Sequence, residues 1–390
     1  MSQQSFRGLG VSAPVADALA ARSIHEPFSI QSLVLPDALA GLDVLAKSPT
    51  GSGKTLAFAL PIVERVTPRD GRPSTLVLVP TRELAQQVTD ELRSVAKPKG
   101  LRIAAVYGGV PIKSQAAQAR EAHVVVATPG RLEDLAQRRL LALDRIRILV
   151  LDEADRMLDM GFKPQVDRIV RRLPRNRQTM FFSATLDGEV GVLARAYTSS
   201  PSRFSAELPA DRAVGEIEHR FLSVDQSTKV ETLAELLRKN TGLTLVFVRT
   251  KRGADRLVRR LRRHDVKAEA LHGDMSQPAR RCALDRFESG KVPVLVATDV
   301  AARGLDIDDV EHVINFDPPD EDKGYLHRTG RTGRAGRSGI AVTFVLPEQQ
   351  AETSRVAGRL GHREQFESSG MKAARAKLVY TSRRGRRSKW

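Results

Sequence analysis

Short apolar runs alternate with amphipathic stretches along most of the chain, and this alternation restricts the folds that it can adopt. Strand-like runs rich in Val, Ile and Leu occupy Leu76–Val79, Val124–Ala127, Ile146–Leu151 and Thr179–Phe182. Between the first two runs, Arg82–Ala96 carries apolar residues at helical spacing. Runs of this kind are typical of parallel strands that helices cover on both faces. We therefore predict an α/β domain with a parallel sheet over residues 1–204.

The same alternation starts again near Ile217. Further strand-like runs occupy Thr244–Val248, Val294–Ala297, His312–Phe316 and Ile340–Leu346, and Lys251–Arg263 is predicted to be a helix. Residues 205–216 contain a proline and a glycine and show no period, which predicts a linker. The chain of 390 residues is thus predicted to form two tandem α/β domains, at 1–204 and 217–350, followed by a C-terminal extension at 351–390.

The charge of the chain points to a polyanionic partner. Lys and Arg number 63 and Asp and Glu number 46, which leaves a net charge of +17. The tail at 371–390 contains basic residues but no acidic residue, and its composition predicts disorder. A basic body with a more basic tail favours nucleic acid as the partner over a merely solubilising surface charge.

Composition also restricts the compartment. No stretch reaches the 18 or so consecutive apolar residues that a membrane-spanning helix needs. The N-terminus lacks the basic start and apolar run of a secretory signal. The single cysteine, Cys282, excludes an internal disulfide and a cysteine-based zinc site. We expect a protein of the cytoplasm without membrane association.

A candidate phosphate loop, Ser48–Thr55, follows the apolar run Val44–Ala46 and precedes a predicted helix. In such loops the glycines turn backbone N–H groups toward a phosphate, the lysine reaches the β and γ phosphates, and the final hydroxyl ligates magnesium. A serine replaces the usual first glycine, and Pro49 removes one N–H donor. The predicted nucleotide-binding residues are Thr50, Gly51, Ser52, Gly53, Lys54 and Thr55.

A cluster of acids, Asp152-Glu153-Ala154-Asp155, follows the strand-like run that ends at Leu151. A carboxylate at a strand end beside a phosphate loop suits a second magnesium contact, usually through water, which is the role predicted for Asp152. The neighbouring Glu153 is predicted to orient or deprotonate the attacking water. On its own this segment would indicate only the solvent-exposed start of a helix. The catalytic roles predicted for Asp152 and Glu153 therefore depend on the presence of the phosphate loop.

The phosphate loop and the literal Asp-Glu-Ala-Asp tetrapeptide resemble those of the DEAD-box ATP-dependent RNA helicases of helicase superfamily 2. The resemblance extends from Phe6 to Arg337, with the motifs in the family's order. It implies two RecA-like domains that use ATP and Mg²⁺. It also implies an enzyme that couples ATP hydrolysis to closure of the two domains on RNA, with local duplex separation or remodelling of RNA–protein complexes.

The resemblance assigns further residues to the nucleotide. Gln31 matches the glutamine that reads adenine, and Phe6 has the spacing of the family's upstream aromatic residue. Ser23 stands where a glycine is usual, and Phe28 stands where a threonine usually follows the proline. Asp306 matches the aspartate that contacts the ATP ribose.

The resemblance also implies RNA contacts and residues that couple the two sites. The implied RNA contacts, which suit phosphates and sugars and therefore little sequence preference, are Pro80, Thr81, Arg82, Gly109, Thr128, Arg131, Gly273 and Thr298. Asp155, Ser183 and Thr185 match the residues that couple hydrolysis to strand separation. Arg331 and Arg334 match two arginine fingers, and His327 matches the residue that links to Asp155.

Two other functions fit the same residues. The protein could be an ATP-gated RNA clamp that unwinds little, or a superfamily 2 helicase that acts on DNA. We expect a monomer whose basic tail tethers RNA through its phosphates, with Tyr380 and Trp390 able to stack on bases. The residues do not specify the RNA target or any ribosomal or degradosome-type partner.

Overall fold

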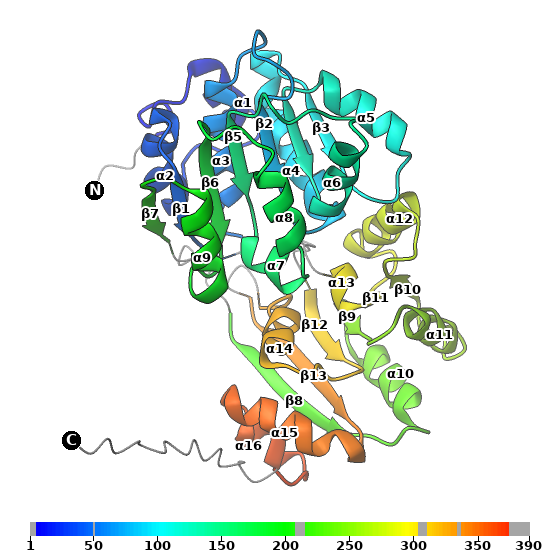
Figure 1. Ribbon diagram of the computed structural model, residues 1–390. Helices are drawn as coiled ribbons and strands as arrows, with labels where there is room; N and C mark the ends of the chain where they lie inside the picture. The colour runs from blue at the N-terminus through cyan, green and yellow to red at the C-terminus, as the bar shows by residue number, and fades with distance from the viewer. Residues whose placement is uncertain (1–4, 50, 207–214, 303–309, 334–336, 374–390) are drawn as a thin grey trace, which may run out of the picture. The chain divides into compact units, whose positions relative to one another are not determined.

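A computed structural model describes residues 5–49, 51–206, 215–302, 310–333 and 337–373. The described residues form two compact units, one before residue 207 and one from residue 215 onward. Each unit is built on one parallel β-sheet with helices packed against it (Figure 1). The prediction of two tandem parallel-sheet α/β domains is confirmed. Most of the basic tail, residues 374–390, lies outside the described residues.

The first domain contains one sheet and the helices that cover it. Its strands are β1 (Val44–Lys47), β2 (Thr75–Leu78), β3 (Ile103–Val106), β4 (Val124–Ala127), β5 (Ile148–Leu151), β6 (Gln178–Ser183) and β7 (Ser202–Ser205). Its helices are α1 (Ala13–Ala20), α2 (Ser29–Ala40), α3 (Lys54–Arg65), α4 (Arg82–Ala96), the 3₁₀ turn η1 (Lys97–Lys99), α5 (Ile112–Glu121), α6 (Pro129–Gln137), α7 (Ala154–Asp159), α8 (Lys163–Val170) and α9 (Gly188–Tyr197).

The second domain repeats this plan. Its strands are β8 (Ile217–Ser223), β9 (Leu243–Phe247), β10 (Ala268–Leu271), β11 (Val294–Ala297), β12 (Val310–Asn315) and β13 (Gly339–Val345). Its helices are α10 (Lys229–Lys239), α11 (Lys251–Arg262), α12 (Gln277–Glu288), α13 (Asp299–Ala302), α14 (Asp322–Thr329), the 3₁₀ turn η3 (Pro347–Gln349), α15 (Gln350–Arg359) and α16 (Arg363–Ser368).

The first sheet has the strand order β3-β4-β2-β5-β6-β1-β7, and all of its described pairings are parallel. Successive strand residues point to opposite faces, so each strand contributes to two cores. Val44 packs in a core with α1 to α4, whereas Leu45 packs on the other face with α6, α8 and α9. This double burial explains why the inner strands are continuous apolar runs.

The second sheet has the order β10-β11-β9-β12-β13-β8, again with parallel pairings. Val246 and Val296 pack against α10 and α11 on one face. Helix α11 begins where the Thr250 hydroxyl accepts a hydrogen bond from the Gly253 N–H at 3.0 Å. This N-cap satisfies a backbone donor that the first helical turn would otherwise leave unpaired.

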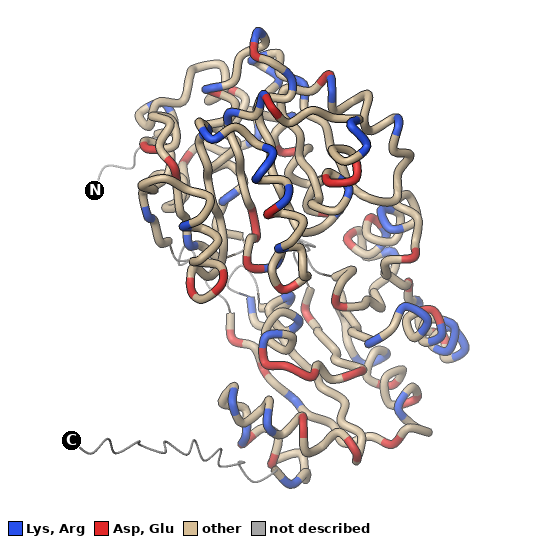
Figure 2. Tube along the Cα trace, in the orientation of Figure 1, with Lys and Arg blue, Asp and Glu red and all other residues tan. Residues whose placement is uncertain are grey.

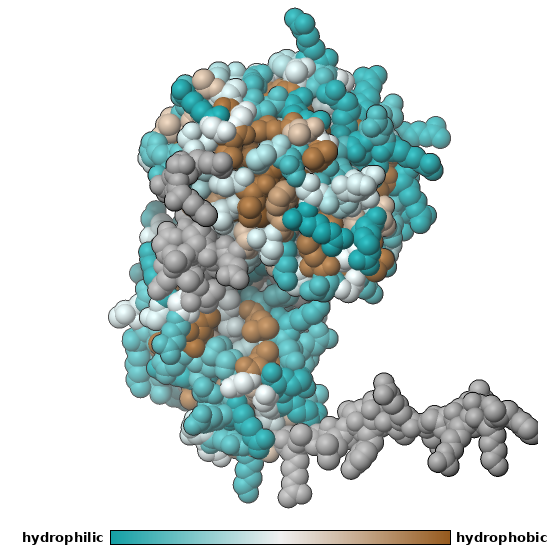
Figure 3. All heavy atoms as spheres, turned by 90° about the vertical axis from the view of Figure 1, so that its left-hand side faces the viewer, coloured by the Kyte–Doolittle hydropathy of each residue, from teal (hydrophilic) through white to brown (hydrophobic). Residues whose placement is uncertain are grey.

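Charged residues are spread over both domains, and α11 is the most densely basic helix in Figure 2. On the face shown in Figure 3, apolar patches are interrupted by hydrophilic side chains. None of the helices within the described residues has the length and apolarity needed to cross a bilayer.

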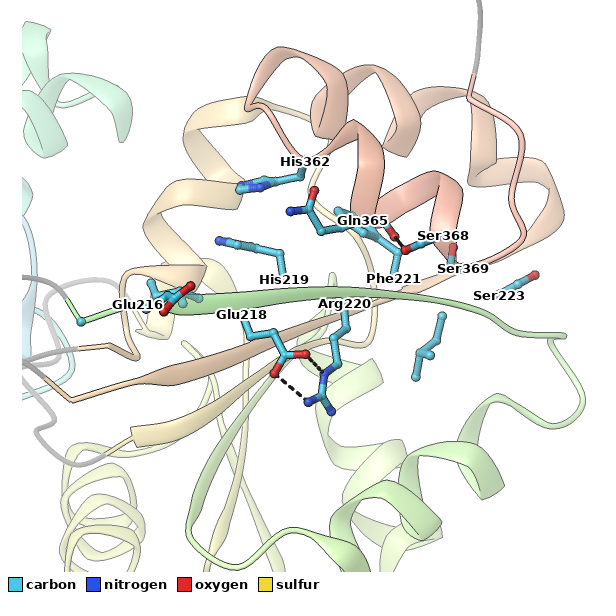
Figure 4. A pocket seen from close by; sticks show the side chains of 13 residues that line it. Glu216, Glu218, His219, Arg220, Phe221, Ser223, His362, Gln365, Ser368 and Ser369 are labelled. Atoms are coloured by element: carbon cyan, nitrogen blue, oxygen red, sulfur yellow. Dashed lines mark hydrogen bonds and ion pairs between the residues drawn. The ribbon is translucent and has the colours of Figure 1, made fainter.

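The C-terminal extension contains two helices, α15 and α16. Helices α15 and α16 fold back on the edge strand β8, with Phe366 and Met371 buried against Phe221. Met371, which the sequence placed at the start of the tail, is thus part of the second domain's core. A cavity of about 950 Å³ lies between β8 and α16 (Figure 4).

Two stacked histidines join β8 to the start of α16 at this cavity (Figure 4). The His219 and His362 rings have centroids 3.8 Å apart, and His219 Nδ1 lies 2.9 Å from the Tyr325 hydroxyl. Burial, and to a lesser extent the neighbouring His362, lowers the pKa of His219 to about 4. Burial also lowers the pKa of His362. Both rings are therefore neutral in the folded protein at neutral pH.

We expect the free energy of unfolding to fall as the pH drops from about 6.5 toward 4. In that range His219 and His362 are protonated in the unfolded chain but remain neutral in the folded protein, because folding lowers their pKa. Acid therefore stabilises the unfolded chain relative to the folded protein. The loss should be about 2 kcal/mol after allowance for solvent screening. Urea unfolding of wild type and His219→Gln at pH 7 and pH 5 measures it. The variant should lose less stability on acidification, whereas a His25→Gln control should behave as wild type; equal losses in all three would contradict this account.

Candidate active site

Three of the predicted motifs meet at the carboxyl edge of the first sheet. The phosphate loop follows β1, Ser183 ends β6, and Asp152 follows β5. Strands β1, β6 and β5 are neighbours in the sheet. Because parallel strands all end at the same edge, residues from distant parts of the sequence come together there.

Ser48, which replaces the usual glycine of the phosphate loop, is fully buried and takes part in the loop's own hydrogen bonding. Its N–H donates to the Ser183 carbonyl at 3.0 Å, and its hydroxyl bonds the Ser52 hydroxyl. The Ser52 hydroxyl also donates to the Pro49 carbonyl at 2.8 Å. The serine thus holds the loop together. Thr50 lies outside the described residues.

The predicted phosphate ligands stand at the start of α3. Lys54 is buried, and its Nζ donates to the Ser48 carbonyl at 3.0 Å, with Thr55 half-buried beside it. Gly53 has φ +87°, and a Cβ there would come within 2.5 Å of Phe28 Cδ2 and 2.6 Å of Gln31 Nε2. Both the backbone angle and the available space therefore require glycine at this position.

Gln31, the predicted adenine reader, connects α2 to the phosphate loop. Its Oε1 accepts a hydrogen bond from the Phe28 N–H at 2.9 Å, and its Nε2 donates to the Gly53 carbonyl at 3.0 Å. Phe6 is buried in the core of the same domain. Ser23 has φ +60°, a left-handed conformation that explains why glycine suits this position in the family.

Asp152 and Glu153 are both buried at the end of β5. Burial raises the pKa of Asp152, and the positive charge of Lys54 opposes that rise. Glu153 has φ +51°, an uncommon value for a residue with a side chain, and its N–H donates to Asp152 Oδ1 at 3.0 Å. Its carboxylate pairs with Arg156 Nη1 at 2.7 Å. A non-glycine residue held in this conformation is typical of a functional position.

The oxygen atoms near the phosphate loop suit a divalent cation that binds together with the nucleotide. Among the described residues, no group of three or more His, Cys, Asp or Glu side chains could hold a metal by itself. Mg²⁺ usually keeps several waters and binds through one or two protein oxygens and the phosphates of its nucleotide. The Thr55 hydroxyl and the Asp152 carboxylate, on neighbouring motifs, fit that requirement.

Ser183 contacts both the phosphate loop and the acidic motif. Its carbonyl accepts from the Ser48 N–H, and its hydroxyl accepts from the Asp155 N–H at 3.3 Å. Thr185, the other predicted coupling hydroxyl, is exposed. A single buried serine therefore connects the phosphate loop to the Asp155 segment.

The other half of the same sheet edge carries the implied RNA contacts of the first domain. These follow β2, β4 and β3, which are neighbours in the sheet. The Arg82 guanidinium lies across Gly109, where a Cβ would come within 2.5 Å of its Nη1. Arg131 Nη1 donates to the Val110 carbonyl at 2.7 Å and to Gln115 Oε1 at 2.9 Å. Burial and the nearby charge of Arg82 lower the pKa of Arg131.

Three of the other implied RNA residues are buried. Pro80 and Thr81 precede α4, and the Thr81 hydroxyl accepts from the Leu84 N–H at 3.2 Å as the N-cap of that helix. Thr128 is buried at the start of α6. Arg82, Gly109 and Arg131 are the more accessible members of the set.

In the second domain, implied RNA contacts again follow neighbouring strands, β10 and β11. Gly273 is exposed, and Thr298 is almost fully buried. Arg280 in α12 is buried and donates to the His272 carbonyl at 2.9 Å. This contact ties α12 to the end of β10.

Arg328 is a central residue of this domain that the sequence analysis did not single out. It is buried, and its Nε and Nη2 donate to the two Asp299 carboxylate oxygens at 2.6 and 2.7 Å. Its Nη1 donates to Asn315 Oδ1 and to the Asp317 carbonyl. The only signal in the sequence was its place in the arginine-rich stretch that runs from Arg328 to Arg337. Arg328 joins the segment after β11 to α14.

Helix α14 also carries His327 and leads into Arg331. Arg331 is 4% exposed, and its Nε donates to the His327 carbonyl at 3.3 Å. His327 is half-buried. Arg334 and Asp306, also predicted to contact the nucleotide, lie outside the described residues.

Replacing Arg328 by methionine should lower the free energy of unfolding by about 1–3 kcal/mol, because it leaves the buried Asn315 Oδ1 without the Arg328 donor and the half-exposed Asp299 without its ion pair. Urea unfolding followed by circular dichroism measures the loss. The matched control is Arg363→Met, which breaks the exposed Arg363–Glu367 pair and should cost less than about 1 kcal/mol. A similar small loss in both variants would show that Arg328 does not hold this domain together.

Comparison with known proteins identifies the family of the chain. Residues 28–191 match the family model described as DEAD/DEAH box helicase, and residues 228–336 match the helicase conserved C-terminal domain. The chain is 40% identical to the DEAD-box ATP-dependent RNA helicase CshA of Bacillus licheniformis over 89% of this chain and 71% of that protein. It is 39% identical to the CshA of Bacillus subtilis over 89% of this chain and 70% of that protein.

Solved structures agree with these matches. The structure of S. cerevisiae Dbp5 bound to RNA and ADP BeF3 covers 96% of this chain and 95% of its own, with 31% identity and a TM-score of 0.79. A DEAD box protein from Methanococcus jannaschii covers 96% and 99%, with 36% identity and a TM-score of 0.52. The chain therefore belongs to the DEAD-box ATP-dependent RNA helicases.

Proposed function

We propose that this chain is an RNA-stimulated ATPase that uses ATP to separate short RNA duplexes or remodel RNA–protein complexes. One observation carries the proposal. Ser183 contacts both the phosphate loop and the Asp155 segment, and the strands that end in the implied RNA contacts adjoin these motifs at one sheet edge. The arrangement gives a short path between nucleotide chemistry and RNA. The membership in the family supports the same conclusion.

In the proposed reaction, the phosphate loop binds the ATP phosphates and Lys54 stabilises the β and γ phosphates. Mg²⁺, held by Thr55 and by Asp152 through water, would neutralise charge that develops on the phosphates. Glu153 orients the attacking water and accepts its proton. Gln31 forms hydrogen bonds with the edge of the adenine ring. Its hydrogen bond to the Gly53 carbonyl connects the adenine site to the phosphate loop.

The second domain supplies the remaining residues that contact the nucleotide or the Asp155 segment. We assign Arg331 and Arg334 to the γ phosphate, His327 to Asp155, and Asp306 to the ribose. These groups would reach the nucleotide when the domains close on RNA, with Thr185 coupling that closure to the Asp155 segment. A ligand drives such closure only by binding the closed state more tightly. Hydrolysis removes the γ contacts and releases the RNA.

The remaining assignments are part of the same proposal. The ATP-binding domain is 1–204, the linker 205–216, the second helicase domain 217–350 and the extension 351–390. The protein acts in the cytoplasm as a monomer, and its basic tail tethers RNA without sequence preference. The contacts to RNA are assigned to Pro80, Thr81, Arg82, Gly109, Thr128, Arg131, Gly273 and Thr298.

Steady-state ATP hydrolysis with and without single-stranded RNA tests the proposal, with DNA of the same sequence in parallel. RNA should stimulate hydrolysis strongly and DNA weakly. Lys54→Ala should abolish the stimulated rate, whereas the exposed control Lys163→Ala should preserve it. Equal stimulation by DNA would favour a DNA helicase, and no stimulation by either nucleic acid would refute the proposal.

A further inference from the structure

Helix α11 has two faces of opposite character. Its apolar side chains, Ala254, Leu257, Val258 and Leu261, are buried in the core beside β9 and β11. On the opposite side lie five exposed arginines at spacings of three and four residues, which we call the arginine face: Arg252, Arg256, Arg259 and Arg260 within the helix, and Arg263 directly after it. These spacings place the five side chains along one stripe of the helix. Figure 2 shows this concentration of basic residues along α11.

The charge of the arginine face is not neutralised within the domain. In the described part of the chain, none of these five arginines forms an ion pair with a carboxylate. The one acidic residue inside the helix, Asp255, has its Oδ1 3.0 Å from His272 Nε2. Arginines three and four residues apart repel one another and destabilise the helix. A partner with closely spaced negative charges would relieve that repulsion.

The helix begins at the implied RNA contacts of its domain. Lys251, its first residue, passes Gly273 so closely that a Cβ there would lie 3.5 Å from Lys251 Cε. Its Nζ pairs with Asp274 Oδ1 at 2.6 Å. From this point the twelve residues of α11 extend for about 18 Å, at 1.5 Å per residue. RNA bound at Gly273 would therefore lie at one end of a basic stripe several phosphates long.

We propose that the arginine face of α11 is an accessory RNA-binding surface that holds the backbone of the RNA beyond the core contacts. The inference rests on the proposed function, since it requires RNA at Gly273. The arginine fork matches phosphate oxygens in pairs, which favours phosphates as the ligand. Helix α11 contains no aromatic residue that could stack on a base. The surface thus binds RNA by charge, without reading its sequence.

The test uses the triple variant Arg256→Gln/Arg259→Gln/Arg260→Gln. The matched control is Arg171→Gln/Arg172→Gln/Arg175→Gln, which removes three exposed charges from the first domain. RNA affinity is measured by fluorescence anisotropy at 50–200 mM salt, with a short oligonucleotide that fills only the core site and one several times longer. Thermal unfolding checks the fold. The triple variant should unfold at the same temperature as wild type or higher, because it removes repulsion.

For the long RNA we expect at least a tenfold rise in Kd in the triple variant at low salt. The slope of log K against log salt should fall by about 2, at roughly 0.7 per lost contact to a single strand. The short RNA should bind within twofold of wild type, the ATPase rate at saturating RNA should be unchanged, and the control should match wild type throughout.

Several results would overturn the inference. Wild-type affinity of the triple variant for long RNA would do so, as would an equal loss in the control. A loss of binding to vesicles of anionic phospholipid, with RNA binding intact, would assign the surface to a membrane instead. Failure of the proposed function is distinguishable, because RNA would then fail to stimulate ATP hydrolysis by wild type.

Discussion

Replacing Glu153 by glutamine should lower the rate constant for ATP hydrolysis by about 10²–10⁴-fold while ATP still binds. The amide keeps the size of the side chain but cannot accept a proton from water. Glu153 is buried beside Asp152 and held in a left-handed conformation, so its carboxylate has a fixed position. Single-turnover hydrolysis and the affinity for a fluorescent ATP analogue separate the two effects.

The matched control for this variant is Glu189→Gln, an exposed glutamate in the first turn of α9. It should hydrolyse ATP as wild type does. If Glu153→Gln keeps more than a tenth of the wild-type rate with RNA saturating, Glu153 is not the residue that activates water. If it fails to bind ATP, its main role is to support the site through its pair with Arg156.

Replacing both Arg331 and Arg334 by alanine should preserve ATP binding and lower hydrolysis by about 10³-fold or more. Guanidinium groups that stabilise charge on the transferred phosphoryl group act mainly in the transition state, so their loss affects the rate and not the binding. RNA-stimulated turnover and nucleotide affinity are again measured separately. Near-normal turnover in the double variant would contradict the assignment.

Arg331 is 4% exposed, so the double variant needs a check of its stability. Thermal unfolding of the double variant provides it. The exposed Arg337, in the same arginine-rich stretch, supplies the control Arg337→Ala, which removes a nearby charge without removing a proposed finger. This control should retain most of the wild-type hydrolysis rate; an equal loss would indicate that net charge alone matters in the stretch.

The interior strands were predicted from the sequence, but three of the edge strands were not. The apolar runs at Val124–Ala127 and Val294–Ala297 coincide with β4 and β11, which helices bury on both faces. Strands β3, β7 and β10 were missed, and all three are sheet edges. An edge strand is less buried and tolerates charged residues such as Arg203 in β7. Strands β7 and β10 therefore lack the continuous apolar signal, whereas the run Ile-Ala-Ala-Val of β3 carries it and was not recognised.

The residues of the candidate site were likewise predicted in part from the sequence. The roles proposed for Lys54 and Asp152 were assigned from residue type, order and spacing. The contacts that connect the motifs did not, because spacing along the chain says little about which side chains meet across a sheet edge. The Gln31–Gly53 hydrogen bond, the Ser183 contacts and the Arg328–Asp299 pair all join segments that are distant in sequence. They became visible only when the strand order was known.

The central claim is that ATP chemistry at this sheet edge is coupled to the separation of RNA strands. Strand separation of a short RNA duplex, followed by fluorescence with ATP, without ATP and with Glu153→Gln, tests it most directly. The account predicts rapid separation only with wild type and ATP. ATP hydrolysis with the duplex left intact would contradict it and identify an RNA clamp.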